Sequence, residues 1–265
     1  IFNQTYQNFE LIILDDASTD GSQELLLEYK SHPKVSHCIM NTKNTGSPFL
    51  QWKKGLELAH GEYIWIAESD DSCDYDFLSK ILDAFENNRE ASIVVAKTVK
   101  YTSGKVYREI KHHIFQHSEK QTINKRNFEY CPILNVSSCV FKNPCLMRSN
   151  SEFINFNIIG DRVFYYEFFS DHTVVKCSTT LSYFRKEIES VSSLSNRNMI
   201  YYKQYFLEHL KLAIIAYDNC YIDIKTYNRY VRKFYCRIRD RLKRKQKLSL
   251  GYLYIFVTYK WNLKS

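Results

Sequence analysis

The sequence predicts an α/β fold, in which a doubly wound and mostly parallel sheet is followed by a C-terminal helical extension. Short, continuous apolar segments such as residues 11–14 alternate with amphipathic segments in the N-terminal part of the chain. Continuous apolar segments are typical of parallel strands buried on both faces, and their alternation with helices is typical of a doubly wound sheet. From about Asn196 onward the pattern changes to long helical segments.

The predicted elements follow one another in a regular order. Strands are expected at residues 10–14, 35–40, 63–67 and 91–99, and helices at residues 22–30, 48–60 and 74–88. Gly61 is expected to end the second helix. Further along, we predict a strand at 137–141, an aromatic helix opening at Gly160-Asp161, and strands at 173–177 and 180–185. We therefore assign residues 1–192 to one domain and residues 193–265 to a basic, aromatic extension.

Composition places the chain among globular proteins. It has 265 residues, 45% of them hydrophobic and 25% charged, with a net charge of +8. The 8 cysteines show no CxxC pair or zinc-ligand spacing, which favours reduced thiols of a cytosol and argues against a sulfur-bound metal. The sequence contains no run of about 20 apolar residues, so it predicts no membrane-spanning helix.

Acidic residues follow two of the predicted strands directly. Asp15 and Asp16 end the first strand, and Glu68, Asp70 and Asp71 end the third. Ligands of doubly wound sheets bind at the carboxyl ends of the strands. Two charges about 4 Å apart repel by roughly 4 kcal/mol at an effective dielectric of 20, and a divalent cation removes that cost. Mg²⁺ or Mn²⁺ holding a diphosphate suits the second cluster. The alternative is that Asp70 and Asp71 cap the following helix.

The segments NQTYQNFELIILDDASTDGS and NTGS, followed by QWKKGLELAHGEYIWIAESDD, resemble family 2 glycosyltransferases of the GT-A fold, of the bacterial cell-surface polysaccharide type. The resemblance covers about residues 1–192. It implies a GT-A domain, a nucleotide-sugar donor with UDP favoured, and Mn²⁺ or Mg²⁺ as cofactor. The family's first strand would precede this chain, so the resemblance implies an N-terminally truncated form that binds nucleotide poorly.

The resemblance also implies roles for single residues. Asp16 would accept a hydrogen bond from the nucleobase, and Ser18, with Asp15, would shape the turn beside it. Asp15 alternatively forms the turn without touching ligand. Asp71 would coordinate the metal, and Asp70 would face the ribose or share the metal. Glu68 stands where the family more often has Asp, and we assign it no role.

Two more positions, Asp161 and Arg185, match family elements in the segments IIGDRVFYYEFF and YFRKEIESVSS. The segment QWKKG departs from the family, because many relatives have Arg-Asn where this chain has Trp52-Lys53, ahead of Gly55. Asp161 would be the catalytic base that deprotonates the acceptor hydroxyl; the alternative is a helix N-cap residue. Lys53 would be a cation for the diphosphate, or else a solvated surface lysine. Arg185 keeps a family position, whereas Glu187 stands where relatives have His, so a contact to the diphosphate or metal is lost or replaced by a carboxylate.

Residues 229–247 are rich in Lys and Arg and contain one acidic residue, Asp240. We consider three interpretations: a solvated helix face, a nucleic-acid surface, and an anionic membrane surface contacted by a basic amphipathic helix. We favour the membrane surface and expect no nucleic-acid partner.

The sequence thus predicts a metal-dependent, inverting glycosyltransferase that moves a sugar from a nucleotide-sugar to a glycan or lipid-linked acceptor in surface polysaccharide synthesis. Its expected location is the cytoplasm, at the inner face of the bacterial plasma membrane. The main alternative is a non-catalytic nucleotide- or glycan-binding relative. A nucleotidyltransferase is a third option, but it would need a glycine-rich phosphate loop, which the visible chain lacks.

Overall fold

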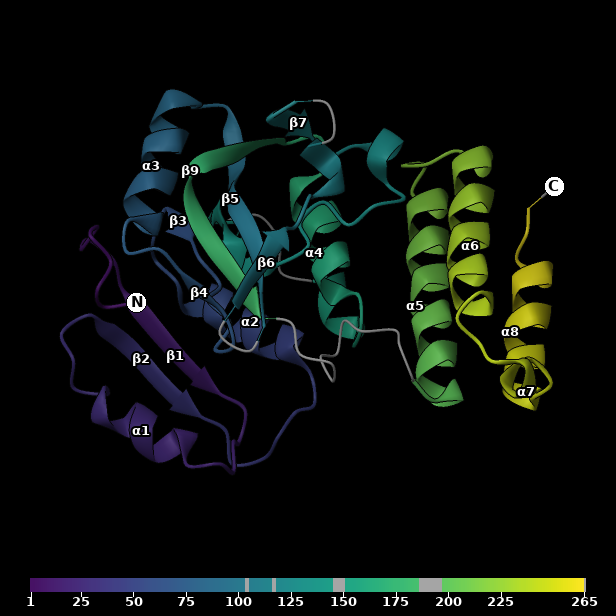
Figure 1. Cartoon of the computed structure of the whole chain (residues 1–265), viewed down its shortest axis with the longest axis horizontal. Helices are drawn as coiled ribbons and strands as arrows, with labels where there is room; N and C mark the ends of the chain where they lie inside the picture. The colour runs from purple at the N-terminus through teal and green to yellow at the C-terminus, as the bar shows by residue number, and fades with distance from the viewer. Residues whose placement is uncertain (103–104, 116–117, 145–150, 186–196, 265) are drawn as a thin grey trace. The chain divides into compact units, whose positions relative to one another are not determined.

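The computed structural model describes residues 1–102, 105–115, 118–144, 151–185 and 197–264 (Figure 1). The chain forms two compact units. The first comprises Ile1–Asn124 and Tyr130–Lys186, and the second comprises Lys125–Glu129 and Glu187–Ser265. The boundary predicted after residue 192 lies outside the described residues.

A small parallel sheet begins the first unit. β1 (Leu11–Asp15) pairs with β2 (Val35–Met40), and α1 (Ser22–Glu28) connects them, as Figure 1 shows. The burial of β1 differs from the prediction of a strand buried on both faces. Residues 11–14 are partly rather than fully buried, because β1 has a hydrogen-bonded neighbour on one side alone within the described residues.

A seven-stranded sheet forms the centre of the first unit, in the order β3-β8-β5-β9-β4, with β6 on β5 and β7 on β9. The predicted parallel pairing is found in β1–β2 and β5–β9, whereas the pairs made by β8, β4, β6 and β7 are antiparallel, so the strands as a whole are mixed in direction. The strands are β3 (Tyr63–Ile64), β4 (Ser72–Cys73), β5 (Ala91–Thr102), β6 (Lys105–Glu109), β7 (Lys120–Thr122), β8 (Cys139–Lys142) and β9 (Thr173–Arg185).

Helix α3 (Phe77–Asn87) closes one side of this sheet. Its Phe77, Ile81 and Phe85 are buried in a cluster with Val94 of β5 and Val175 of β9. Full burial of side chains of this size contributes roughly 1.5–3 kcal/mol each. Asp74, in the segment between the acidic residues 68–71 and α3, accepts from the Leu181 amide and the Tyr183 hydroxyl of β9, both at 2.9 Å, and so fixes that segment against the strand.

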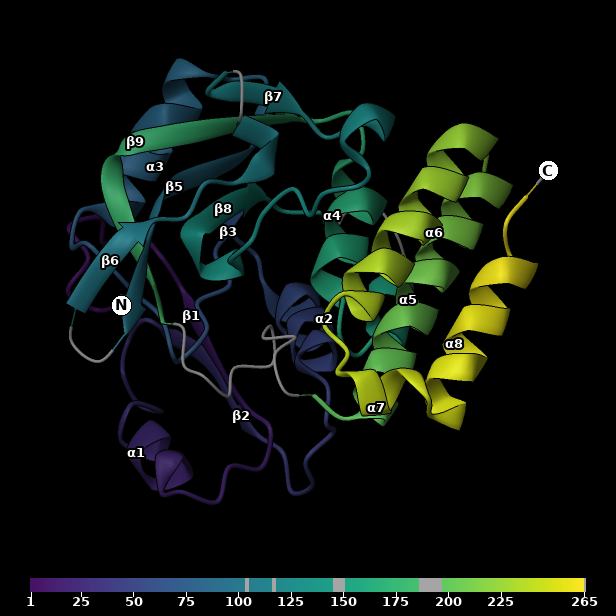
Figure 2. The same cartoon turned by 45° about the vertical axis from the view of Figure 1, so that its right-hand side comes forward.

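Helices α2 (Pro48–Leu58) and α4 (Gly160–Phe169) lie side by side (Figure 1 and Figure 2). Trp52 of α2 meets Phe164 of α4 edge to face, with ring centroids 5.8 Å apart. Phe164 also contacts Phe141 of β8 and Phe153. This aromatic packing ties α4 to the sheet. The described residues also form short 3₁₀ helices at His113–Phe115, Lys125–Asn127, Val136–Ser138 and Glu152–Asn155.

Three predicted boundaries differ from the structure. The strand expected at 63–67 ends at Ile64, because the Trp65 indole N–H donates to the Ser137 carbonyl, 2.9 Å away, and the chain leaves the sheet there. The second helix ends at Leu58 rather than at residue 60. The two strands expected at 173–177 and 180–185 form one strand, β9, whose register against β5 shifts between Ala96 and Lys97.

The second unit is helical. It contains α5 (Met199–Asp218), α6 (Ile224–Arg239), α7 (Arg244–Lys247) and α8 (Leu250–Trp261). The side chains of Asn198, Asp223 and Ser249 cap the N-termini of α5, α6 and α8. Stacked rings join the helices, including His209 on Phe234 and Tyr235 on Tyr259. Among the described helices, none combines the length and apolar character needed to cross a bilayer.

Candidate active site

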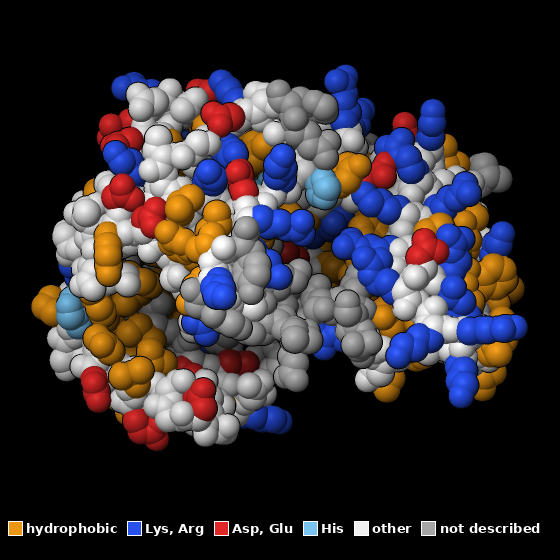
Figure 3. Space-filling model, viewed as in Figure 1, with side chains coloured by type: hydrophobic (Ala, Val, Ile, Leu, Met, Phe, Trp, Pro, Cys, Tyr) orange, Lys and Arg blue, Asp and Glu red, His pale blue; other side chains and the backbone are white. Residues whose placement is uncertain are grey.

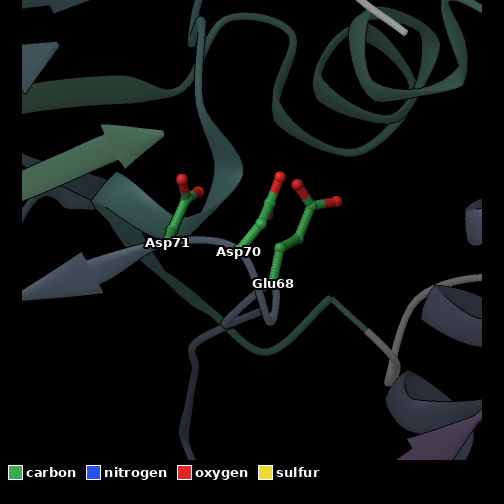
Figure 4. Close-up of side chains that lie close together, drawn as sticks. All are labelled: Glu68, Asp70 and Asp71. Carbon is green, nitrogen blue, oxygen red and sulfur yellow. The ribbon is translucent and has the colours of Figure 1, made fainter. Parts of the chain in front are cut away.

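Three carboxylates gather on the loop between β3 and β4. Ligand oxygens of Glu68, Asp70 and Asp71 all lie within 4.8 Å of one another. Figure 4 shows their side chains pointing to the same side of the loop. The sequence prediction that Asp70 and Asp71 lie together is therefore met by the geometry, and Glu68 joins them. Neither Asp70 nor Asp71 caps α3, since the residue preceding that helix is Asp76.

Contacts from distant parts of the chain hold this loop. The Glu68 amide donates to Ser137 Oγ at 3.0 Å, and the Asp71 amide donates to the Glu68 carbonyl at 3.2 Å. The backbone amide of Arg185, at the end of β9, donates to Asp71 Oδ1 at 3.0 Å. Arg185 thus reaches the acidic loop through its backbone. Ser137 was not among the sequence candidates, although it anchors the loop through both its carbonyl and its hydroxyl.

Besides burial, the mutual repulsion of the negative charges of the loop raises the pKa of Glu68. Burial, followed by the charges of Asp70, Asp71 and Asp161, raises the pKa of Glu68 to about 7. Burial also raises the pKa of Asp71, against the opposing effect of the Arg185 amide. The charge of Asp161 on α4 makes the smallest of these contributions to the pKa of Glu68, and the cluster of ligand oxygens itself does not include Asp161.

The residues present fit a hard divalent cation. Asp71 Oδ2 is buried and makes no hydrogen bond of ordinary geometry among the described residues, although the Ser137 and Asn135 side chains lie near enough to oppose the rise in the Asp71 pKa that burial causes. An unpaired buried carboxylate oxygen is costly unless a cation or donor meets it. Three carboxylates with oxygen ligands this close are the donor set that Mg²⁺ and Mn²⁺ prefer. Asp71, with Asp70 and Glu68 beside it, would hold such an ion.

Asp161 lies in the first turn of α4 and is partly buried. Its Oδ1 accepts from the Arg162 amide at 2.7 Å, and the Cys131 thiol lies 3.9 Å from its Oδ2. Burial raises the pKa of the Asp161 carboxyl, although the Arg162 amide and guanidinium oppose this effect. A carboxylate with a raised pKa is a stronger base than a solvated one, which suits proton abstraction.

A cavity of about 330 Å³ lies beside the acidic loop. Glu68, Asp71, Trp65, Tyr75 and Ser137 are among the residues that line it. It combines carboxylates with aromatic walls, as sites for small polar ligands do.

The first acidic cluster is held by its own surroundings. Asp15 is buried, and its Oδ2 accepts from the Ser18 amide at 3.0 Å and from Gln23 Nε2 at 2.6 Å. Asp15 and Ser18 therefore do shape the turn after β1, in which Ala17 has a positive φ of 60°.

Asp16 is fully engaged within the chain. Its carboxylate accepts from Asn41 Nδ2 at 2.7 Å, from Thr45 Oγ1 at 2.8 Å and from Gln51 Nε2 at 3.0 Å. A nucleobase at Asp16 would therefore share or replace one of these donors. Sequence reasoning missed this network, although the polar segment NTKNTGS was the visible signal for it.

The remaining candidates lie at the periphery. Lys53 faces Glu57 one helical turn away at 3.6 Å, as a surface ion pair does. The neighbouring Lys54 instead donates to Asn41 Oδ1 at 3.1 Å, next to Asp16. Glu187, at the position of the family histidine, lies outside the described residues.

Comparison with known proteins decides the family. The sequence profile of Glycosyl transferase family 2 matches residues 1–144, more than half of the chain. The chain belongs to this family. Among relatives of this family 2 chain, the putative teichuronic acid biosynthesis glycosyltransferase TuaG of Bacillus subtilis is 34% identical over 83 residues, which are 31% of this chain and 32% of TuaG. The poly(ribitol-phosphate) beta-glucosyltransferase of Bacillus spizizenii is 31% identical over 99 residues, 37% of this chain and 16% of that enzyme. The alignments thus span a third or less of these relatives' length.

Among solved structures, S. aureus TarS 1-349 in complex with UDP-GlcNAc has a fold similar to that of this family 2 chain. The TM-score is 0.63 at 16% identity, and the match covers 97% of this chain and 72% of that one. The same TarS segment in complex with UDP gives a TM-score of 0.65 at 15% identity. The GT-A fold predicted from the sequence is confirmed.

Gly160 begins α4 directly before Asp161, where the backbone packs closely on Phe49 of α2. We expect Gly160→Ala to lower the stability of the fold and to displace Asp161. A Cβ at Gly160 would lie 2.4 Å from Phe49 Cδ2 and 2.6 Å from Cε2. Relieving such overlap typically costs about 1–3 kcal/mol of stability, and here it displaces the start of α4. Thermal unfolding should show a lower Tm. In Gly251→Ala, the new Cβ meets Met199 at 3.3 Å, and we expect little change. An unchanged Tm in Gly160→Ala would contradict the close approach of α2 and α4.

Glu68→Gln is expected to stabilise the metal-free protein at pH 8 but not at pH 4. The folded-state pKa of Glu68, about 7, exceeds the usual 4.5. The protonated side chain therefore contributes fully to the free energy of unfolding below pH 4.5, and this contribution is lost as the pH rises through 7. Gln carries no charge and escapes that loss. A Tm gain of roughly 2–4 °C would accompany each kcal/mol recovered when the buried charge of Glu68 and its repulsion from neighbouring carboxylates are removed. The exposed Glu62→Gln serves as control. Equal Tm changes of Glu68→Gln at both pH values would refute the raised pKa of Glu68.

Proposed function

We propose that this chain transfers a sugar from a nucleotide-sugar, with a UDP-sugar favoured, to a glycan or lipid-linked acceptor in surface polysaccharide synthesis. The observation that carries the proposal is the cluster of three carboxylates at residues 68–71, and Asp161 on α4 adds a smaller electrostatic effect to the raised pKa of Glu68.

The acid groups divide the chemistry between them. Asp161 would take the proton from the acceptor hydroxyl, since its pKa is raised by burial and its Oδ1 is held by the Arg162 amide. The hydroxyl oxygen would then attack the anomeric carbon on the face opposite the leaving diphosphate, and configuration would invert. Asp71 and Asp70 would orient the donor through a bound Mn²⁺ or Mg²⁺. When bound, that ion supplies positive charge to the diphosphate as it leaves.

Relatives support the choice of donor and pathway class. TarS binds UDP-GlcNAc and UDP in its solved complexes. TuaG is named for teichuronic acid biosynthesis, and a second relative is a poly(ribitol-phosphate) beta-glucosyltransferase. A UDP-sugar and an envelope glycan acceptor are the choices these names favour.

A panel of UDP- and GDP-sugars tests the proposal. With Mn²⁺ and with donor at high concentration, so that weak nucleotide binding does not hide turnover, we expect the chain to release UDP from at least one UDP-sugar, and to release it faster when a matching acceptor is present. Chelation by EDTA should stop the release, and fresh Mn²⁺ should restore it. Metal-dependent binding of UDP without release from any donor would overturn the proposal and favour a non-catalytic nucleotide-binding protein.

A further inference from the structure

Helix α8 presents an apolar face to solvent. Leu250, Leu253, Tyr254, Val257 and Trp261 recur at helical spacing and fall on one side of the helix. The opposite side carries Ile255 and Tyr259, which are buried against the rest of the helical unit. We call the first set the outer face of α8.

The exposure of this outer face is unusual. Leu250 is 84% exposed, Leu253 53% and Trp261 85%, and Leu248 just before the helix is also exposed. Single exposed apolar residues are common, but a continuous apolar helix face in water marks a surface that binds something. Figure 3 shows hydrophobic side chains gathered along the edge of the helical unit beside Lys and Arg.

Basic residues surround the outer face. After Asp240 the chain has no acidic residue, while Arg244, Lys245 and Lys247 form most of α7, immediately before α8. Lys260 flanks the outer face at its far end, and Lys203 of α5 lies over the Tyr254 ring at 4.0 Å. The apolar face is therefore framed by positive charge on both ends and one side.

The combination of an apolar face with surrounding positive charge distinguishes between two binding partners for the outer face, a second copy of the chain and an anionic lipid surface. A second copy of the chain would bring α7 and Lys260 against the same positive charges, which disfavours a symmetric pair. An anionic lipid surface instead accepts both features, because acyl chains take the apolar residues and headgroup phosphates neutralise the cations. Trp and Tyr are also the residues that favour the interface between lipid and water.

We propose that the outer face of α8 binds the surface of an anionic lipid bilayer, with Leu250, Leu253 and Trp261 entering the headgroup region and α7 and Lys260 contacting phosphates. This inference does not rest on the proposed sugar transfer, since it uses only the helical unit.

Vesicle flotation with the full chain tests it. We expect the protein to float with vesicles of phosphatidylcholine and phosphatidylglycerol at three to one, and to remain at the bottom with phosphatidylcholine alone. Raising the salt from 50 to 500 mM should reduce flotation. Reversing two charges in Lys245→Glu/Lys247→Glu should lower the partition coefficient by at least about twentyfold, given about fivefold for each basic residue. Lys30→Glu, on the first unit, should behave as wild type.

A matched pair of apolar substitutions tests the outer face itself. Leu253→Gln should weaken flotation severalfold, whereas Leu25→Gln, at a side chain that is 55% exposed, should not. Circular dichroism establishes that each variant is folded. Trp261 fluorescence should move to shorter wavelengths on adding anionic vesicles, and Trp261→Phe should remove that shift, since Trp52 is buried and the partly buried Trp65 lies in the first unit.

Three results would overturn the proposal. They are equal flotation with neutral and anionic vesicles, equal flotation of Leu253→Gln and Leu25→Gln, and concentration-dependent self-association without lipid that Leu253→Gln abolishes. The last would make a second copy the occupant of the outer face.

Discussion

Asp161→Asn is expected to lower kcat for sugar transfer by about 10²–10⁴, the range typical for removal of a general base. Asn preserves the shape of the side chain and its contact with the Arg162 amide, but it does not accept a proton at neutral pH. The carboxylates of residues 68–71 stay in place, so binding of Mn²⁺ and UDP should persist. Initial rates with saturating donor and acceptor measure the effect.

Asp171→Asn is the matched control for this substitution. Asp171 is exposed just after α4 and has a positive φ of 65°, a conformation that Asn adopts readily. We expect wild-type rates from it. Wild-type kcat in Asp161→Asn would show that Asp161 is a structural residue at the start of α4.

Asp71→Asn is expected to weaken Mn²⁺ binding and thereby the metal-dependent rate. The substitution removes the negative charge of a carboxylate whose buried Oδ2 makes no hydrogen bond of ordinary geometry within the described part of the chain, while Oδ1 can still accept from the Arg185 amide. Loss of one carboxylate ligand should raise the Mn²⁺ concentration at half-maximal rate by about tenfold or more, the cost of roughly 1.4 kcal/mol of binding. Activity measured across a Mn²⁺ series reports this shift.

Asp83→Asn, an exposed change on α3, controls for the altered net charge. An unchanged Mn²⁺ dependence in Asp71→Asn would place the cation elsewhere or remove it from the account. Since burial raises the pKa of Asp71, the wild-type protein should also bind Mn²⁺ more tightly as the pH rises, because protons leave the site when the cation enters.

The acidic site could be predicted in part from local sequence. Asp70 and Asp71 are adjacent and follow a strand, so their closeness required no tertiary information. The turn formed by Asp15 and Ser18 was also local, and the structure contains it. The approach of Asp161 came from the resemblance to a family, because nothing in the residues between 71 and 161 fixes that distance.

Other features depended on contacts that sequence patterns do not encode. Ser137 holds Trp65 and Glu68 across about seventy residues of chain, and this contact ends β3 at Ile64. An apolar run such as IWIA predicts burial, but the run alone does not predict the hydrogen bond from the Trp65 indole to the Ser137 carbonyl, where the chain leaves the sheet. The donors that saturate Asp16 were likewise hidden in a polar loop whose partners become visible only after folding.

The central claim is that Asp71 and Asp161 serve one reaction in different roles, one through the cation and one through the proton. UDP release as a function of Mn²⁺ concentration, compared among wild type, Asp71→Asn and Asp161→Asn, tests it most directly. The account predicts a shifted Mn²⁺ midpoint in Asp71→Asn, and a reduced maximal rate at an unchanged midpoint in Asp161→Asn. Identical curves for wild type and either variant would contradict it.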